Sequence, residues 1–287
     1  MPQPEEDVYQ PIDLRALAKT TVPKFAPFIP GFVYNRLEKL LHVRELNECF
    51  EKHYNDSPED FLAGVEDVLQ NSIEFGGPGE EVLKEFAGEN VIFAGNHPYG
   101  GPEAMALMNY LIHLYPNIKL VAQNYLRFIK PLQSCCVYNK AGVRTLMDHV
   151  ESSKSLLIYP AGLCSRILKN KEVFDLAWHS AFVKIAKRNN MPVIIIYTDG
   201  QLSKRFFRWQ RFQGKSGLAS ILLPDEMFKM AGKKLRMVIS RPIDPSVFTD
   251  DVSYDQWALR LRQYCYNLRF DPFATFNPAC LSSLPLQ

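Results

Sequence analysis

Residues 91–103 read Val-Ile-Phe-Ala-Gly-Asn-His-Pro-Tyr-Gly-Gly-Pro-Glu, and this stretch decides how the other residues of the 287-residue chain are interpreted. Its apolar beginning is typical of a buried strand, and the apolar stretch 104–112 that follows predicts a helix. His97 therefore stands where a strand gives way to a helix, with glycines that permit a tight turn and with Glu103 in the first helical turn. A histidine can accept a proton near neutral pH, and a carboxylate can fix its tautomer and stabilise its cation.

The same alternation of strand and helix continues along the chain. After the strand at 91–94, strand-like runs occupy 118–122, 135–138, 156–159, 193–197 and 235–240. Helix-like stretches fall between them, notably at 141–152 and 176–189, and a last amphipathic helix covers about 253–269. This order predicts an α/β fold in which helices flank a mixed, largely parallel sheet. Ligands bind at the carboxyl ends of the strands in such sheets, which is where His97 stands.

A helical segment precedes this region. Residues 1–30 are rich in proline, and a helical pattern then runs from about 32 to 53. Ser57 is a favourable N-cap with Pro58 at the first helical position, so a second helix is expected to begin there and to run to about 73. The run Gly-Gly-Pro-Gly at 76–79 marks the clearest boundary. We therefore expect an N-terminal arm and helical segment at 1–75, a main domain at 80–270 and a loose tail at 271–287.

Composition excludes several classes of protein. The chain is 47% hydrophobic and 22% charged, and its 33 basic residues nearly balance 31 acidic ones, so bulk charge gives no case for nucleic acid. The acidic, proline-containing start differs from a secretory signal, and no apolar stretch approaches the ~20 residues that span a bilayer. The six cysteines lack metal-site spacing and are interpreted as reduced, mostly buried thiols of a cytoplasmic protein.

A second motif follows another apolar strand. Residues 159–166 read Tyr-Pro-Ala-Gly-Leu-Cys-Ser-Arg. Arg166 suits bidentate recognition of a phosphate or a carboxylate. An ordinary Pro-Gly turn is the alternative interpretation, and Cys164 as a nucleophile would have no motif of its own to support it.

Together the two motifs resemble those of the glycerolipid acyltransferases, the lysophosphatidic-acid acyltransferase superfamily. The resemblance is closest to a bacterial subgroup labelled hemolysin-like or ornithine-lipid O-acyltransferase-like, with Asn-His-Pro-x-Gly-Gly-x-Asp and Pro-Ala-Gly-Leu-Cys-Ser-Arg patterns. Glu103 stands here in place of Asp, and Ala161 replaces the Glu of the wider Phe-Pro-Glu-Gly-x-x-Ser motif, which is linked to a glycerol-phosphate acceptor. The resemblance spans roughly residues 30–268 and implies that 80–270 form an acyltransferase domain.

The resemblance implies a peripheral membrane O-acyltransferase. A fatty acyl group would move from acyl-CoA or acyl-carrier protein to the hydroxyl of a lysolipid, either a lyso-amino lipid or a lysophospholipid. His97 would act as general base and Glu103 would orient it. No cofactor and no metal would be needed.

Substrate contacts are expected from the motif residues Asn96, Gly100, Gly101, Lys140, Gly162, Ser165 and Arg166. Backbone N–H groups near Gly100 and Gly101 or at Gly162 are candidate donors to an oxyanion. Lys140 takes the place of the Arg that usually ends the superfamily's second motif. It could meet an anionic group, and a surface lysine at a helix start is the alternative.

Residues 204–215 have the most unusual local composition, with cations and aromatics interleaved and no acidic residue. Such a segment can dock on anionic lipid, and we expect membrane contact there by Lys204, Arg205, Phe206, Phe207, Arg208, Trp209 and Arg211. Inward-packed aromatics beneath a basic rim, or a site for single-stranded nucleic acid, are alternatives. Residues 22–33 are a second candidate contact. A peripheral position on the inner face of the cell membrane would follow.

Two other functions compete with an acyltransferase. A non-catalytic lipid- or acyl-CoA-binding protein could use the same fold, and a hydrolase would replace the acceptor by water. A lone histidine is often structural, and Glu103 could be a first-turn acid favoured by the helix dipole.

Overall fold

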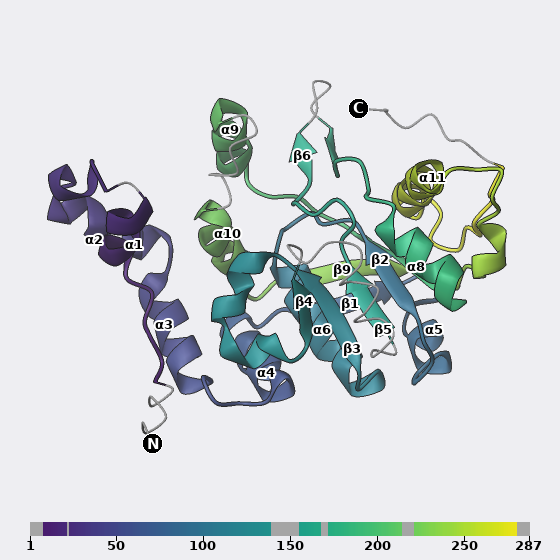
Figure 1. The fold of residues 1–287 in the computed structure, drawn as a ribbon, viewed down its shortest axis with the longest axis horizontal. Helices are drawn as coiled ribbons and strands as arrows, with labels where there is room; N and C mark the ends of the chain where they lie inside the picture. Colours follow the sequence, from purple (N-terminus) through teal and green to yellow (C-terminus); the bar gives the residue numbers. More distant parts are fainter. Residues whose placement is uncertain (1–7, 22, 139–154, 168–171, 214–220, 280–287) are drawn as a thin grey trace, which may run out of the picture.

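The computed structural model describes residues 8–21, 23–138, 155–167, 172–213 and 221–279. A central sheet separates two layers of helices, and a helical arm, α1 (Leu14–Thr21), α2 (Gly31–Leu40) and α3 (Val43–Lys52), lies at one side of the molecule (Figure 1). The predicted mixed, largely parallel α/β sheet is confirmed.

The main sheet has seven strands. In spatial order they are β1 (Ser72–Gly76), β9 (Lys234–Ile239), β8 (Val193–Thr198), β2 (Ile92–Gly95), β5 (Ser155–Ile158), β3 (Ile118–Ala122) and β4 (Cys136–Tyr138). The strands from β8 to β4 are parallel to one another, β9 is antiparallel to β8, and β1 is parallel to β9. Each predicted strand is present within one or two residues of its expected bounds.

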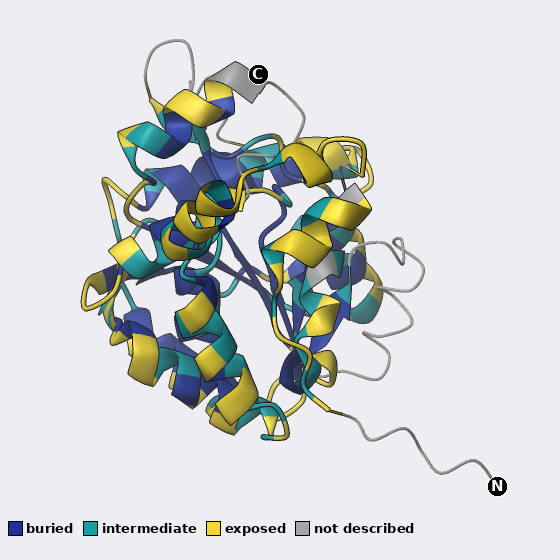
Figure 2. Ribbon diagram, turned by 90° about the vertical axis from the view of Figure 1, so that its left-hand side faces the viewer, coloured by how far each residue is buried: buried dark blue, intermediate teal, exposed yellow. Residues whose placement is uncertain are grey.

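Both faces of the sheet are buried (Figure 2). Phe93 belongs to the core that contains residues of α4 (Pro58–Leu69), α5 (Gly79–Glu85) and α6 (Pro102–Leu114). Its neighbours Ile92 and Ala94 belong to the other core, with α8 (Ala181–Asn189) and α11 (Tyr254–Asn267). A parallel strand covered on both faces needs apolar residues throughout, which explains the unbroken apolar runs in the sequence.

Shorter elements surround the strand ends. They are the helices α9 (Lys204–Gln213) and α10 (Leu223–Lys229), the 3₁₀ turns η1 (Ala26–Phe28), η2 (Asn124–Phe128), η3 (Lys130–Gln133) and η6 (Pro245–Val247), and the two-stranded β6 (Arg166–Ile167) and β7 (Val173–Phe174). Among the described residues, no helix combines the length and apolarity needed to cross a bilayer.

The structure corrects two expectations. The helix expected over 32–53 is broken, because His42 adopts a left-handed conformation with φ of 52° and separates α2 from α3. Residues 72–75, expected within the N-terminal segment, belong to β1, which pairs with β9 of the main sheet from Ser72–Lys234 to Gly76–Val238. The helix expected at 141–152 lies outside the described residues.

The α4 cap can be tested directly. Ser57 Oγ accepts a hydrogen bond from the Asp60 N–H at 3.1 Å, as the sequence predicts. We expect Ser57→Ala to lower the free energy of unfolding by about 1 kcal/mol, because one N-terminal donor loses its acceptor. Urea denaturation would measure this change, with Ser57→Asp as the control that keeps a capping oxygen. Equal stability of Ser57→Ala and the wild type would contradict the role of the cap.

Candidate active site

The site forms where three adjacent parallel strands end. β2 lies between β8 and β5, with Gly95 paired to Ile196 and Ala94 to Ile158. The chain therefore brings His97, two residues beyond β2, close to Tyr159, the first residue beyond β5. The two rings stack with centroids 4.3 Å apart and planes 28° apart.

The Asn96 side chain forms hydrogen bonds between two strand ends at this edge of the sheet. Its amide oxygen accepts a hydrogen bond from the Thr198 N–H at 2.7 Å, and its amide nitrogen donates to the Thr198 carbonyl at 2.9 Å. The side chain is 2% exposed. Asn96 was expected to contact substrate, but its amide is used to join the end of β2 to the end of β8.

His97 and Glu103 meet as the sequence predicts. Nδ1 of His97 and Oε1 of Glu103 are 3.0 Å apart, and the Glu103 side chain is fully buried. The distance suits an ion pair, although the imidazole is not aligned to make a hydrogen bond through Nδ1. Catalytic hydrogen bonds often tighten only when substrate is bound. Because Glu103 lies beside Nδ1, Nε2 is the ring nitrogen left for a substrate.

The turn between β2 and α6 folds around the carboxylate of Glu103. Its oxygens accept backbone N–H bonds from Tyr99 at 2.9 Å, and from Gly100 and Gly101 at 3.2 Å each. Gly100 has φ of 78°, so glycine is needed for the turn. The N–H of Gly162 donates to the Tyr159 carbonyl at 2.9 Å. The oxyanion donors expected at the three glycines are therefore already engaged, and this corrects that part of the prediction.

Glu103 is held as an anion. Burial acts to raise its pKa, but the attraction to His97 and the hydrogen bonds from the backbone outweigh burial and place the pKa below its usual value. Glu103 can therefore stabilise an imidazolium while remaining charged at neutral pH.

Asp175 is a buried residue of the candidate site that no sequence motif singled out. It is fully buried, and its Oδ1 accepts from the His97 N–H at 3.2 Å and from Ser165 Oγ at 2.6 Å. Oδ2 accepts from the Trp178 indole at 2.9 Å. The Ser165 N–H donates in turn to the His97 carbonyl at 2.8 Å. Burial raises the pKa of Asp175, and the hydrogen bonds oppose this rise. Asp175 thus joins the first motif to the second.

The second motif contributes less to the cavity wall than expected. Ser165 is 2% exposed and uses its hydroxyl on Asp175. The Arg166 guanidinium faces the Gln210 side chain, whose amide oxygen can accept from Arg166 Nε at 3.1 Å when turned toward it. Asn96, Ser165 and Arg166 are absent from the described lining of the cavity beside His97. Burial raises the pKa of Cys164 to about 12, which leaves no thiolate to act as nucleophile.

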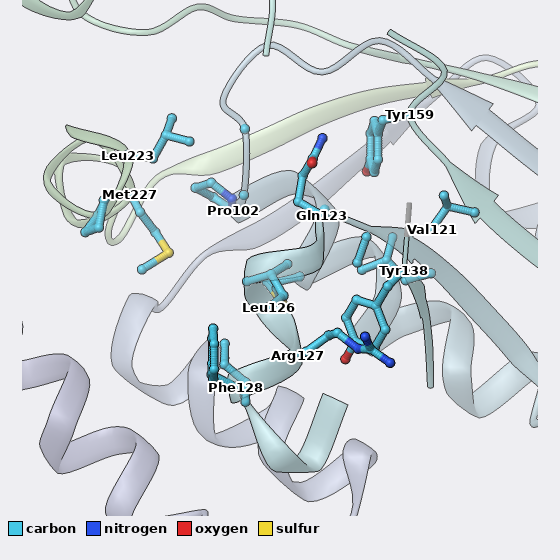
Figure 3. Close-up of a pocket in the computed structure, with 18 of the residues that line it drawn as sticks. Pro102, Val121, Gln123, Leu126, Arg127, Phe128, Tyr138, Tyr159, Leu223 and Met227 are labelled. Atoms are coloured by element: carbon cyan, nitrogen blue, oxygen red, sulfur yellow. The ribbon is translucent and has the colours of Figure 1, made fainter. Parts of the chain in front are cut away.

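A large cavity opens beside the histidine. Its volume is about 2350 Å³, and His97, Tyr159, Gly100, Gly101 and Gly162 contribute to its wall. Figure 3 shows a mainly apolar section of this wall, formed by Pro102, Val121, Leu126, Phe128, Leu223 and Met227, with Gln123, Arg127 and Tyr138 as polar neighbours. An apolar cavity of this size with few polar groups suits a lipid ligand.

The remaining site expectations are partly met. Helix α9 buries Phe206 at 1% exposure and Phe207 at 6%, so neither ring is available to a membrane, whereas Trp209 is 53% exposed. Lys204, Arg208 and Arg211 are exposed, and Arg205 pairs with Asp225. Lys140 lies outside the described residues. In the described part of the chain, no group of His, Cys, Asp and Glu is arranged to hold a metal ion.

The role of Asp175 predicts a measurable coupling. Asp175→Asn should lower the free energy of unfolding by about 1–3 kcal/mol, because an amide offers one acceptor oxygen where the carboxylate offers two. If its NH₂ faces the Trp178 indole, the double variant with Trp178→Phe should be less destabilised than the sum of the single variants. Urea denaturation of the four proteins would measure this, and strictly additive effects would contradict the contact.

Two curated proteins and one solved structure are similar to this chain over most of its length. Two curated lyso-glycine lipid O-acyltransferases align with 270 residues, which are 90% of this chain. The protein from Phocaeicola vulgatus is 29% identical with 95% of its length covered, and the protein from Bacteroides thetaiotaomicron is 28% identical with 97% covered. The crystal structure of the 1-acyl-sn-glycerophosphate (LPA) acyltransferase PlsC from Thermotoga maritima superposes with a TM-score of 0.43 and 15% identity, over 88% of this chain and 94% of that chain.

A family profile decides the classification. The profile described as "Acyltransferase" matches residues 15–269, which include the helical arm, the whole sheet and both motifs. The chain therefore belongs to the acyltransferase family.

Proposed function

We propose that this chain is a peripheral membrane O-acyltransferase that moves a fatty acyl group from acyl-CoA or acyl-carrier protein to the hydroxyl of a lyso-amino lipid. The observation that carries the proposal is the His97–Glu103 pair, 3.0 Å apart, at the wall of a mainly apolar cavity. No cofactor enters the reaction.

The proposed reaction needs one base. The acceptor hydroxyl gives its proton to Nε2 of His97 as its oxygen bonds to the thioester carbon and the carbonyl electron pair moves to oxygen. The carbonyl then re-forms, the carbon–sulfur bond breaks, and the leaving thiolate takes the proton back from His97. Glu103 offsets the transient imidazolium charge. General-base help of this kind typically contributes ~10²–10⁴-fold to the rate.

Three observations favour a lyso-amino lipid as acceptor. Both curated relatives carry the name lyso-glycine lipid O-acyltransferase, and a glycine head group ends in a carboxylate. Ala161 puts no acidic side chain in the second motif. Cations also contribute to the cavity wall, among them Arg127, which lies 5.3 Å over the Tyr138 ring, and Lys184. We propose these cations, rather than Arg166, as partners of the head group.

The N-terminal arm offers a surface for the membrane. Phe25, Phe28 and Phe32 are 70%, 82% and 70% exposed. Exposed cations lie among them at Arg15, Lys19, Lys24, Arg36 and Lys39. Leu17 and Phe128, also exposed at 54% and 89%, contribute to the cavity wall, so a lipid could enter from this side. Exposed aromatic rings and cations in one helical arm suit the head-group region of anionic lipid. Since the thioester donors are intracellular, we place the protein on the inner face of the membrane.

Turnover should depend on the His97–Glu103 pair. His97→Ala should reduce acyl transfer by ~10²-fold or more, because the base is lost. Glu103→Asp should retain more activity than Glu103→Gln, because it keeps the charge that stabilises the imidazolium. Thiol release from palmitoyl-CoA and from an acyl-carrier-protein thioester would be measured, with lyso-glycine lipid, lyso-ornithine lipid and lysophosphatidic acid as acceptors.

The outcomes of this assay separate the competing functions. Acceptor-dependent release that disappears in His97→Ala supports the proposal, and the preferred acceptor identifies the head group. Release without any acceptor would indicate a thioesterase. Lipid binding without release from either donor would indicate a binding protein. Full activity of His97→Ala would contradict the role of His97 as general base.

Binding to anionic membranes should depend on the exposed rings of the N-terminal arm. Phe28→Ser with Phe32→Ser should weaken binding to vesicles that contain anionic lipid by roughly tenfold or more, because two rings no longer enter the apolar region. Flotation of vesicles with bound protein would measure this. Phe270→Ser with Phe273→Ser is the matched control, since these rings are 79% and 66% exposed and follow α11 at the side opposite the arm (Figure 1). Equal losses in both pairs would contradict docking through the arm.

A further inference from the structure

The hydroxyl of Tyr159, a residue of the cavity wall, lacks a hydrogen-bond partner within the described protein. Tyr159 is 8% exposed. Buried hydroxyl groups nearly always have a partner, and an exception at a ligand site often indicates that the ligand supplies one. The Tyr138 hydroxyl, also on a residue of the cavity wall, is likewise buried without a partner among the described residues. Tyr115, away from the cavity, shows the ordinary arrangement, since its buried hydroxyl donates to the Leu83 carbonyl at 2.8 Å.

The unpartnered hydroxyl lies beside the proposed base. The Tyr159 ring stacks on the His97 imidazole at 4.3 Å, so the phenol is held against the side chain that would take the acceptor's proton. Tyr159 also contributes to the cavity wall, and Figure 3 labels it there together with Gln123 and Val121. A group bound at His97 would therefore lie near the hydroxyl as well.

The reaction needs a donor that the turn does not supply. Attack on a thioester gives a tetrahedral intermediate whose oxygen carries a full negative charge, and donors to that oxygen lower the barrier. The N–H groups of Gly100 and Gly101 donate to Glu103, and that of Gly162 donates to the Tyr159 carbonyl. These backbone groups are thus occupied, whereas the Tyr159 hydroxyl has no partner in the part of the chain that the structure describes.

We propose that Tyr159 is a catalytic residue whose hydroxyl donates a hydrogen bond to the thioester carbonyl oxygen as that oxygen becomes an anion. This inference rests on the proposed acyl transfer. The phenol keeps its proton throughout, while His97 alone carries the proton from the acceptor hydroxyl to the leaving thiolate. Burial raises the pKa of Tyr159 well above its usual value, which is consistent with a donor that stays protonated.

Tyr159→Phe tests the proposal, because it removes only the oxygen and keeps the stacked ring. We expect kcat to fall by roughly 10²–10³-fold with little change in KM, since the hydrogen bond is made in the transition state. The melting temperature should stay equal or rise, because an unpaired buried hydroxyl is removed. Tyr115→Phe is the matched control. It breaks a satisfied hydrogen bond away from the cavity, so its melting temperature should fall while kcat is kept.

Other outcomes overturn the proposal in distinguishable ways. An active wild type with an unchanged kcat in Tyr159→Phe would show that the hydroxyl has no catalytic role. A rise in KM alone would assign the hydroxyl to ground-state binding. A wild type that transfers no acyl group from either thioester would overturn the proposed function and this inference with it. A fall in kcat equal to that of Tyr115→Phe would reduce the effect to a general loss of packing.

Discussion

The fully buried carboxylate of Glu103 is the constraint on which the site depends. An isolated carboxylate is far too costly to bury, so the surrounding chain has to supply donors and an opposite charge. Three consecutive N–H groups of the turn, from Tyr99 to Gly101, and the imidazole of His97 meet that need. The acid, the turn and the start of α6 therefore form one unit. Loss of the charge of Glu103 would weaken the hydrogen bonds that hold the turn carrying His97. It would also remove the ion pair with the imidazole.

The second buried acid completes this arrangement from another part of the chain. Asp175 holds the N–H of His97, and Ser165, which also binds Asp175, holds the carbonyl of the same residue. One acid thus fixes the backbone of His97 and the other faces its ring. The two sequence motifs act together because they meet on Asp175, and this gives Ser165 a structural task where sequence alone suggested a substrate contact.

Local patterns predicted the parts of this structure that local physics controls. Apolar runs located the central strands, Ser57 located a helix start, and the strand-to-helix change at His97 located the site at a carboxyl end of the sheet. The contact between Asp175 and the His97 N–H joins residues 78 positions apart, so no short-range pattern could reveal it. The division of α9 into a buried and an exposed face could have been predicted from its sequence. Phe206, Phe207 and Gln210 share its buried face at helical spacing. Composition had favoured membrane contact by Phe206, Phe207 and Trp209, with inward packing of the aromatic residues as the alternative.

The position of β1 has a consequence for how the chain is assembled. β1 forms its ladder with β9, and Asn71, next to β1, donates to the Met230 carbonyl across 159 positions of sequence. During synthesis on the ribosome, β1 emerges early and has to wait for β9 before this edge of the sheet can close. The parallel core of β2, β3, β5 and β8 is complete sooner. Pairing between strands that lie far apart in the sequence forms slowly. Until it forms, an open strand edge is accessible to a chaperone or to a neighbouring nascent chain.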